Sequence, residues 1–158
     1  MSSDNIANKS QEVEISFYDS VNSPTTLEEN ELVDFLHTSL DEFGDPKQHI
    51  RAAIEYSCSS HKGRGGFVVL GRLRNKLVGA VVINQTGMSG YIPENILVYI
   101  AVDSNTRGTG VGKKLMKKAM SIAKGNIALH VEPNNPAKFL YEKLGFTNKY
   151  LEMRYEKK

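Results

Sequence analysis

The stretch Asn105–Met116, NTRGTGVGKKLM, places three glycines within five positions and then runs directly into lysine and leucine. It follows Ile96–Val102, ILVYIAV, which is apolar at every position and therefore predicts a central strand with both faces buried. After it, Gly112–Lys124 carries its apolar residues in one helical stripe. A buried strand, a glycine-rich turn and an amphipathic helix together predict a phosphate-binding junction. The first amides of a helix lack internal partners, and the helix dipole is positive there.

Other phosphate-binding motifs fit this turn poorly. A Walker loop needs four residues between its glycines and then Lys followed by Ser or Thr, whereas three residues separate Gly108 from Gly112 and Lys113 precedes another lysine. The dinucleotide motif G-x-G-x-x-G would need a glycine where Lys113 stands. A turn that uses glycine only for positive φ leaves the neighbouring Arg107 unexplained. The turn therefore favours a phosphate held by bare amides, with Arg107 and Lys113 adding positive charge.

The rest of the chain alternates between strand-like and helix-like patterns. Strands are predicted over 12–18, 67–73, 77–83, 96–102, 127–131 and 149–155, and helices over about 26–40, 47–59, 112–124 and 136–144. A tight turn at Arg74–Lys76 joins the second and third strands, and either Thr25 or Thr26 can cap the first helix. This order of elements predicts a mixed α/β fold.

Length and composition indicate one ordinary globular domain. The chain has 158 residues, 40% of them hydrophobic and 24% charged. Residues 1–10 are polar and are expected to form a disordered tail before a domain over 11–158. We expect no membrane span, because no apolar run approaches 18 residues, and no leader, so the expected location is the cytoplasm. The single cysteine, Cys58, fits a reducing compartment and is best interpreted as a small buried hydrophobe.

The net charge of +2 conceals a strong asymmetry along the chain. Residues 1–60 hold 12 acidic and 3 basic residues, a balance of −9, and residues 61–158 hold 6 acidic and 17 basic residues, a balance of +11. A basic part suits an anionic ligand and an acidic part attracts a cationic one. The alternative is an acidic helix face lying against a basic sheet rim. Nucleic acid is not an expected partner, because the lysines of 113–118 share one helix without interleaved aromatic residues.

Two ordered motifs resemble the GNAT superfamily of acetyl-CoA-dependent N-acetyltransferases. RGTGVG matches the family signature Arg/Gln-x-x-Gly-x-Gly/Ala, and NNPAKFLYEKLGF, downstream of it, is similar to the family's segment Asn-x-x-Ala followed by Leu-Tyr-Glu-Lys-Leu-Gly-Phe. The resemblance covers roughly Phe67–Tyr155. It implies a GNAT-like acyl-CoA N-acyltransferase fold with a central mixed, mostly antiparallel sheet flanked by helices.

The resemblance also implies where acetyl-CoA binds as co-substrate. The amides from Gly108 to Gly112 would hold its pyrophosphate, and its pantetheine arm would pair with the backbone around Ile100–Val102, where this strand splays from the strand at 127–131. The residues that the resemblance assigns to the coenzyme are Ile100, Ala101, Val102, Arg107, Gly108, Thr109, Gly110, Val111, Gly112, Lys113, Asn134, Ala137 and Tyr141. No metal site is expected.

Tyr141 matches the family's tyrosine beside the thioester sulfur, and its chemistry suits a general acid. Coenzyme A leaves as a thiolate when an amine attacks, and a phenol with a pKa near 10 is protonated at neutral pH and can donate. From the residues alone Tyr141 would instead be interpreted as a core aromatic beside Phe139, Leu140 and Leu144. The family context favours the acid.

The general base stays open between Glu94, His130 and water. The length of the pantetheine arm places the sulfur near Val98, and Glu94 lies four residues before it, roughly 13 Å along a strand, so Glu94 would need a bulge or a water relay. His130 falls in the adjacent predicted strand, where a lone histidine is more often structural.

The function indicated is transfer of an acetyl group from acetyl-CoA to a primary amine by direct attack in a ternary complex. Neither motif contains a cysteine, which disfavours an acyl-enzyme. A catalytically silent acyl-CoA sensor on the same fold is the alternative, and a basic nucleotide-binding regulator is a weaker one. The acidic residues of 28–45 suggest a cationic acceptor, although such residues usually form a solvated face. A homodimer is possible, because the last predicted strand can close the sheet or pair with a neighbour.

Overall fold

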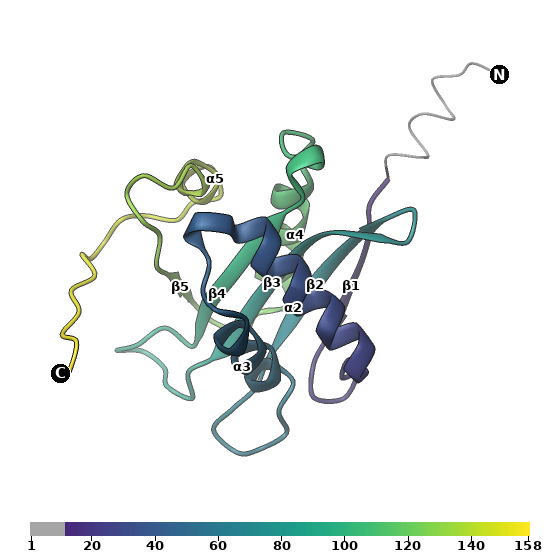
Figure 1. Ribbon diagram of the computed structural model, residues 1–158. Coiled ribbons are helices and arrows are strands. Elements are labelled where there is room, and N and C mark those ends of the chain that lie inside the picture. Colours follow the sequence, from purple (N-terminus) through teal and green to yellow (C-terminus); the bar gives the residue numbers. More distant parts are fainter. Residues whose placement is uncertain (1–11) are drawn as a thin grey trace.

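The computed structural model describes residues 12–158, so the predicted tail over 1–10 lies outside the described residues. These residues form one five-stranded sheet in the order β1-β2-β3-β4-β5 (Figure 1). The strands are β1 (Glu14–Tyr18), β2 (Gly66–Leu73), β3 (Lys76–Gln85), β4 (Asn95–Val102) and β5 (Ile127–Leu129). The helices are α2 (Thr26–Leu40), α3 (Lys47–Ser57), α4 (Val111–Ile122) and α5 (Ala137–Lys143), with the short 3-10 turns η1 (Asp41–Phe43) and η2 (Ser104–Thr106).

The sheet is mixed and mostly antiparallel, as the sequence predicts. Strands β1 to β4 pair antiparallel in chain order, and β4 and β5 pair parallel. Arg74 and Asn75 join β2 to β3 with φ of 52° and 66°. Positive φ at both central residues is the geometry of a two-residue hairpin turn whose twist matches the strands.

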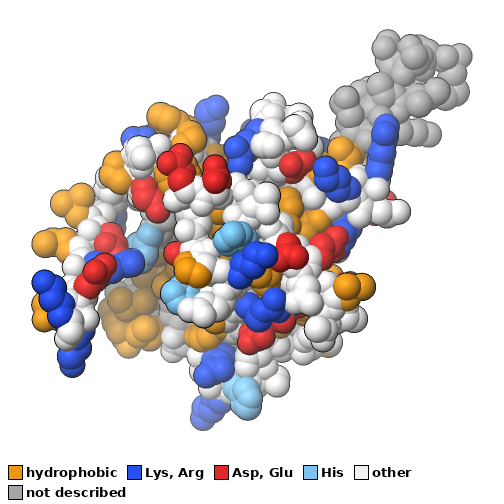
Figure 2. Space-filling model, viewed as in Figure 1, with side chains coloured by type: hydrophobic (Ala, Val, Ile, Leu, Met, Phe, Trp, Pro, Cys, Tyr) orange, Lys and Arg blue, Asp and Glu red, His pale blue; other side chains and the backbone are white. Residues whose placement is uncertain are grey.

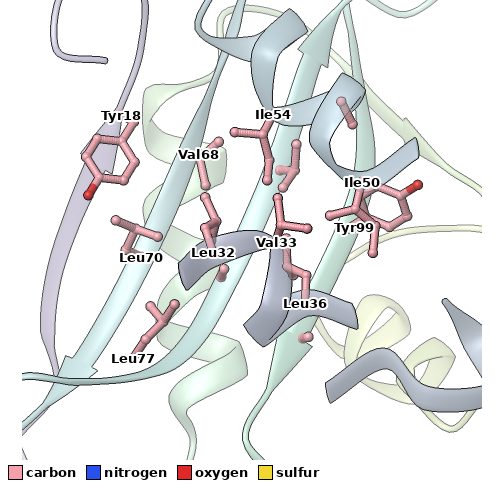
Figure 3. Close-up of a cluster of buried hydrophobic side chains, with 14 residues drawn as sticks. Tyr18, Leu32, Val33, Leu36, Ile50, Ile54, Val68, Leu70, Leu77 and Tyr99 are labelled. Carbon is pink, nitrogen blue, oxygen red and sulfur yellow. The ribbon is translucent and has the colours of Figure 1, made fainter. Parts of the chain in front are cut away.

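Helices cover both faces of the sheet and divide the core into two clusters. On one face α2 and α3 pack Leu32, Val33, Leu36, Ile50 and Ile54 against β2, β3 and β4 (Figures 1 and 3). On the other face α4 packs Leu115 and Met116 against the same strands, and α5 joins them through Tyr141. Central strands covered on both faces need apolar residues at every position, which explains the unbroken apolar runs in β3 and β4.

The first helix begins with a complete capping box. The Thr25 hydroxyl accepts from the Glu28 amide at 3.2 Å and the Glu28 carboxylate accepts from the Thr25 amide at 2.9 Å, so Thr25 is the N-cap. The other Glu28 oxygen accepts from the Tyr18 hydroxyl at 2.9 Å, which ties α2 to β1. None of the described helices is both long and apolar enough to cross a membrane.

The predicted strand at 149–155 is wrong, and the one at 127–131 is shorter than expected. Residues 147–158 form no helix or strand, and β5 ends at Leu129, which leaves His130 outside it and exposed. A strand is stabilised by the partner it pairs with. Within the described chain, no neighbouring strand pairs with the alternating pattern of 149–155.

Candidate functional site

The open edge of β4 is the first feature of the candidate site. Strand β5 pairs with β4 only over Asn95–Leu97, whereas β3 pairs with it as far as Val102. From Val98 to Val102 the second edge of β4 therefore faces no described strand. Alternate backbone groups on this edge remain available for hydrogen bonds to an extended ligand. The predicted splay between these strands is present, with Ile100, Ala101 and Val102 along it.

A β-bulge interrupts β4 at the start of this open edge. Val82 pairs with Tyr99 and Ile83 pairs with Leu97, so Val98 is the extra residue. Val98 and Tyr99 both pack on the side of α2 and α3, whereas Leu97 and Ile100 pack on the side of α4. The bulge thus reverses the alternation of side chains and brings Tyr99 to the same face as Val98.

The glycine-rich junction connects β4 and η2 to α4, and its glycines have two different physical roles. Gly108 and Gly110 have φ of 82° and 88°, and a Cβ at either would meet only open space. Both are therefore needed for backbone conformation and leave the surface of the turn bare. Gly112 is helical, and a Cβ there would lie 3.3 Å from Leu140 and 3.5 Å from Val102. Gly112 thus lets α4 pack closely on α5 and β4.

The junction presents unused amides. The first backbone bond of α4 runs from the Lys114 amide to the Gly110 carbonyl at 3.1 Å. In the described chain, the backbone amides from Arg107 to Lys113 donate no hydrogen bond, and Thr109 donates its hydroxyl to the Thr106 carbonyl. Val111 is buried below the turn and anchors it to the core. Free amides at the positive end of a helix form a site for an anion.

The two basic residues of the junction lie in different surroundings. The Arg107 guanidinium donates to the Val102 carbonyl at 3.2 Å and to the Ser39 carbonyl at 2.9 Å. Arg107 therefore joins the junction to the C-terminal end of α2 and fixes the turn against the body. Lys113 is exposed on the first turn of α4. Its side chain can add charge beside the free amides.

The second motif forms the loop before α5 and α5 itself. Asn134 is exposed, and the Asn135 side chain instead accepts from the Ala137 amide at 2.9 Å. Asn135 is therefore the residue that orders the start of α5, a role that an asparagine directly before Pro136 could have indicated. Ala137 is half-buried against the α4-side cluster.

Tyr141 is both a core aromatic and a candidate donor. Its side chain is only 6% exposed, and its ring lies 5.9 Å from the ring of Phe146. Its hydroxyl makes no hydrogen bond to any described residue. Burial, with a smaller contribution from the charge of Glu132, raises the pKa of Tyr141 to about 12. The phenol is therefore protonated throughout the neutral range.

The two predicted bases lie at opposite ends of the pairing between β4 and β5. The Glu94 carboxylate accepts from the Asn126 amide at 3.3 Å and would collide with a Cβ on Gly125, so it lies against the start of β5. His130 is exposed beyond the end of β5. Glu94 therefore lies away from Val98, whereas His130 follows the Leu97–Leu129 pair just as Val98 does and stands beside it in the register of the two strands.

A tyrosine meets an aspartate of the acidic residues of 28–45 at the bulge, a contact that the sequence analysis did not predict. The Tyr99 hydroxyl donates to Asp45 Oδ2 at 2.5 Å, from β4 to the connection between η1 and α3. Burial, then the hydrogen bond and the charge of Asp45, raise the pKa of the Tyr99 phenol well above its ordinary value. Because the two residues are far apart in the sequence, no local pattern indicates their contact.

Buried Asn95 joins β4 to β5 at the end where the two strands are still paired. It is 1% exposed, and its side-chain amide donates to the carbonyls of Lys124 at 2.9 Å and Asn126 at 3.2 Å. The Asn95 backbone amide donates to the Asn126 carbonyl as well. These bonds fix the start of β5 to β4, so the two strands diverge only after Leu97.

A pocket of about 360 Å³ lies beside the bulge. Its walls include Ile96 and Val98 of β4, Tyr56 of α3, Asn84 of β3 and Met88 of the following loop. Its lining contains no carboxylate. Asn84 Oδ1 accepts from the Ser57 hydroxyl at 2.8 Å, which fixes the orientation of the Asn84 amide.

The acidic residues of the first helices are largely engaged with neighbours. Glu29 pairs with Arg51 at 2.8 Å, Glu31 with Arg72 at 2.6 Å and Asp34 with Lys47 at 2.9 Å. Figure 2 shows acidic and basic side chains intermixed on this face. The excess of acid in residues 1–60 is thus partly balanced within the molecule. Among the described residues no group of three potential metal ligands lies together.

Comparison with known proteins identifies the family. The model of the acetyltransferase (GNAT) family matches residues 30–146, which include the glycine-rich junction, the bulged strand and α5. The chain belongs to the acetyltransferase (GNAT) family. As a GNAT protein it is an acyltransferase of the acetyl-transferring kind. No curated protein sequence matches the chain.

Solved structures with this fold are numerous and distant in sequence. PH1933 from Pyrococcus horikoshii OT3 is 24% identical, with a TM-score of 0.67 over 90% of this chain and 93% of that one. The aminoglycoside N-acetyltransferase AAC(6')-Iy, solved with CoA, is 15% identical, with a TM-score of 0.66 over 93% and 97%. A ribosomal-protein-alanine N-acetyltransferase from Brucella melitensis biovar Abortus 2308 is 18% identical, with a TM-score of 0.59 over 92% and 99%. At these identities the likeness shows that the GNAT fold is shared.

Proposed function

We propose that this GNAT protein is an N-acetyltransferase that moves the acetyl group of acetyl-CoA directly to a primary amine. The observation that carries the proposal is the alignment of three features along β4. These are the free amides from Arg107 to Lys113, the open edge over Ile100–Val102, and the bulge at Val98. A diphosphate, an amide-bearing arm and a thioester follow one another in acetyl-CoA in the same order.

The residues present suit that co-substrate. The bare turn at Gly108 and Gly110 lets phosphate oxygens approach backbone N–H groups, and Lys113 adds a positive charge. Alternate backbone groups of Ile100–Val102 on the open edge, other than the Val102 carbonyl that accepts from Arg107, offer the pairing that a further strand would receive. The CoA complex of a protein with the same fold, the aminoglycoside acetyltransferase, supports this assignment.

Tyr141 is proposed as the general acid. In the reaction the amine nitrogen forms a bond to the acetyl carbon, the carbon–sulfur bond breaks, and the electron pair remains on sulfur. The Tyr141 hydroxyl has its proton available and no described partner, so it can donate to that sulfur. Because the pKa of Tyr141 is raised to about 12, the phenol holds its proton tightly. It therefore donates a hydrogen bond to the departing thiolate more readily than it transfers its proton completely. Donation alone lowers the barrier, because charge develops at the sulfur.

The proton of the attacking amine is proposed to leave through Tyr99 and Asp45. An acceptor ammonium must lose a proton before it attacks, and Tyr99 packs beside Val98 on the side of the sheet that carries α2 and α3. The Tyr99 oxygen can accept the proton of the amine as its own proton passes to Asp45 across the existing hydrogen bond. Cys58 takes no part, because burial and then the charges of Asp19 and Glu29 raise the pKa of its thiol to about 11.

The acceptor is proposed to enter from the pocket lined by Tyr56, Ile96 and Val98. Structural neighbours whose names include an aminoglycoside acetyltransferase and a ribosomal-protein-alanine acetyltransferase support an amine as acceptor. The absence of a carboxylate from the lining favours an amine next to apolar groups over a polycation. An apolar surrounding also favours the neutral form of an amine, which is the form that attacks.

Thiol release measured with purified protein, acetyl-CoA and a panel of primary amines tests the proposal. Amine-dependent release of free coenzyme A is the expected result, with calorimetric binding of acetyl-CoA in the absence of amine. The alternative is a silent acyl-CoA sensor. Saturable coenzyme binding without release by any amine would establish that alternative instead.

A further inference from the structure

The connection between β3 and β4 exposes an apolar surface that the proposed function does not explain. We name residues 86–93 the β3–β4 loop, which extends beyond the end of the sheet (Figure 1). Three of its large apolar residues reach solvent: Met88 is 42%, Tyr91 83% and Ile92 38% exposed. The loop contains no charged residue. Exposed apolar side chains gathered on one uncharged loop mark an interaction surface.

Hydrogen bonds fix the β3–β4 loop at its base. The Thr86 hydroxyl donates to the Pro93 carbonyl at 2.8 Å and accepts from the Met88 amide at 3.1 Å. The Thr86 backbone amide donates to the Glu94 carbonyl at 2.9 Å. The backbone of Met88 is therefore tied to the ends of β3 and β4. A surface that is already ordered loses less conformational freedom when a ligand binds to it.

The β3–β4 loop continues one wall of the pocket beside the bulge. Met88 belongs both to the exposed surface of the loop and to the lining of the pocket, and Thr86 lines the same pocket. On the opposite wall, the Tyr56 hydroxyl donates to the Gln85 carbonyl at 2.8 Å, so its proton is already engaged. The pocket and the loop thus form one continuous surface that is mainly apolar.

The size and the charge of this surface indicate what it binds. A ten-carbon chain, roughly 12 Å long when extended, exceeds the width of a compact space of about 360 Å³. The end of such a chain would leave the pocket where Met88 lies at its rim. No carboxylate lines the pocket and no charge lies on the loop, so a polycation finds no opposite charge along this path. An apolar chain is instead stabilised there, because its surface is removed from water.

We infer that the acceptor is a primary amine with a long apolar chain, whose amine end lies in the pocket and whose chain lies across Met88, Tyr91 and Ile92. The inference rests on the proposed function and names the class of acceptor for that reaction. Tyr91 and Ile92 determine specificity, because they contact only the part of the chain that leaves the pocket. A short amine binds in the pocket alone and does not reach them.

Calorimetric binding of n-hexylamine, n-octylamine and n-decylamine to the full-length protein saturated with coenzyme A tests the inference. Coenzyme A carries no acetyl group, so binding is measured without transfer. Each methylene that leaves water is expected to raise the affinity by about fourfold. The increase is expected to continue from n-hexylamine, which fits inside the pocket, to n-decylamine. An affinity that stops rising after n-hexylamine would overturn the inference.

Two tyrosine variants locate the contact. Tyr91→Ser is expected to lower the affinity for n-decylamine by about tenfold and to leave that for n-hexylamine unchanged. Tyr150→Ser is the matched control, because Tyr150 is 79% exposed and Tyr91 is 83% exposed. It should change neither affinity, and both variants should keep the melting temperature of the wild type. Equal affinities of the two variants for n-decylamine would contradict the proposed contact.

Thiol release with the same amines separates this inference from the proposed function. The expected result is a KM that falls as the chain lengthens. Release of coenzyme A at the same KM for all three amines would keep the proposed function and overturn the inference. Binding that strengthens with chain length, without any release, would overturn the proposed function alone, and the surface would then bind apolar amines without acetylating them.

Discussion

The hydroxyl of Tyr99 donates to the carboxylate of Asp45 at 2.5 Å, and this bond joins the bulged strand to the connection before α3. Asp45 is exposed and Tyr99 is 8% exposed, so the bond lies at the boundary between core and solvent. It places a carboxylate and a phenol next to the position where the sequence motifs indicate the thioester.

Removal of the carboxylate is therefore expected to affect turnover more than stability. Asp45→Asn keeps a hydrogen-bond partner for Tyr99 but cannot take up a proton, so kcat with a primary amine should fall about 10²-fold. The free energy of unfolding should fall by only about 1 kcal/mol. Asp41→Asn, in η1 just before that connection, is the matched control and should leave both unchanged. Steady-state kinetics and urea denaturation measure the two effects, and an unchanged kcat for Asp45→Asn would exclude the relay.

Tyr141→Phe removes the proposed acid and keeps the ring in the core. Turnover should fall by about 10²-fold, whereas the calorimetric affinity for acetyl-CoA should change little. The control is Tyr155→Phe, which removes a phenolic hydroxyl at a position that is 87% exposed. Equal turnover of wild type and Tyr141→Phe would reduce Tyr141 to a packing residue.

Two glycine variants distinguish a role of the turn in binding acetyl-CoA from the effect of backbone strain alone. Gly110 and Gly63 have nearly the same φ, 88° and 86°, and a Cβ at either meets no atom within 4 Å. Gly110→Ala and Gly63→Ala should therefore each cost about 1 kcal/mol of stability. Only Gly110→Ala should weaken acetyl-CoA binding, by about tenfold, since its methyl group fills the space next to the free amides. Calorimetry of both variants decides, and equal affinities would argue against a phosphate at this turn.

Alkaline pH should destabilise the fold through its buried phenols. The pKa of Tyr18 is raised to about 12 by burial and by Glu28, that of Tyr141 to about 12, and that of Tyr99 further still. In the unfolded chain tyrosine titrates near 10, so above that pH the unfolded state binds fewer protons than the folded state. The stabilisation is complete below pH 10 and should be lost as pH rises through 10 to 12. Chemical denaturation at several pH values should show a shallower decline for Tyr141→Phe than for Tyr155→Phe.

The buried side-chain hydrogen bonds of Asn95 should contribute more to the free energy of unfolding than a similar hydrogen bond at the surface. Asn95→Ala leaves the Lys124 carbonyl without its buried donor and should lower the free energy of unfolding by about 1 to 3 kcal/mol. Asn22 also donates from its side chain to a backbone carbonyl, that of Phe17, but in an exposed turn. Asn22→Ala should cost less than 1 kcal/mol, because water replaces the lost bond. Thermal denaturation measures both variants. Similar losses of stability in the two would show that burial does not strengthen the hydrogen bonds of Asn95.

The sequence predicts most elements correctly because their signals are local. The apolar run of 96–102, the glycines after it and the stripe of 112–124 indicate strand, turn and helix, and each is found within a few residues of its expected place. Of the predicted site residues, the structure places Val111, Ala137 and Tyr141 in the core cluster on the α4 side and Gly112 beside Leu140 and Val102. Asn134 lies exposed beside them, and Arg107 is held against α2. The roles of these residues toward acetyl-CoA stay predictions.

The sequence by itself determined the glycine-rich junction and the order of elements, because periodicity and backbone freedom act over a few residues. Only the tertiary structure decided the bulge at Val98 and the contact between Tyr99 and Asp45. Each depends on register between strands or on residues far apart in the chain. The segment at 149–155 shows the same limit of sequence-based prediction. Its alternating apolar and charged residues fit a strand with two faces, but a strand forms only where it pairs with the edge of another strand. In the described chain the outer edge of β5 is free, but 149–155 does not pair with it.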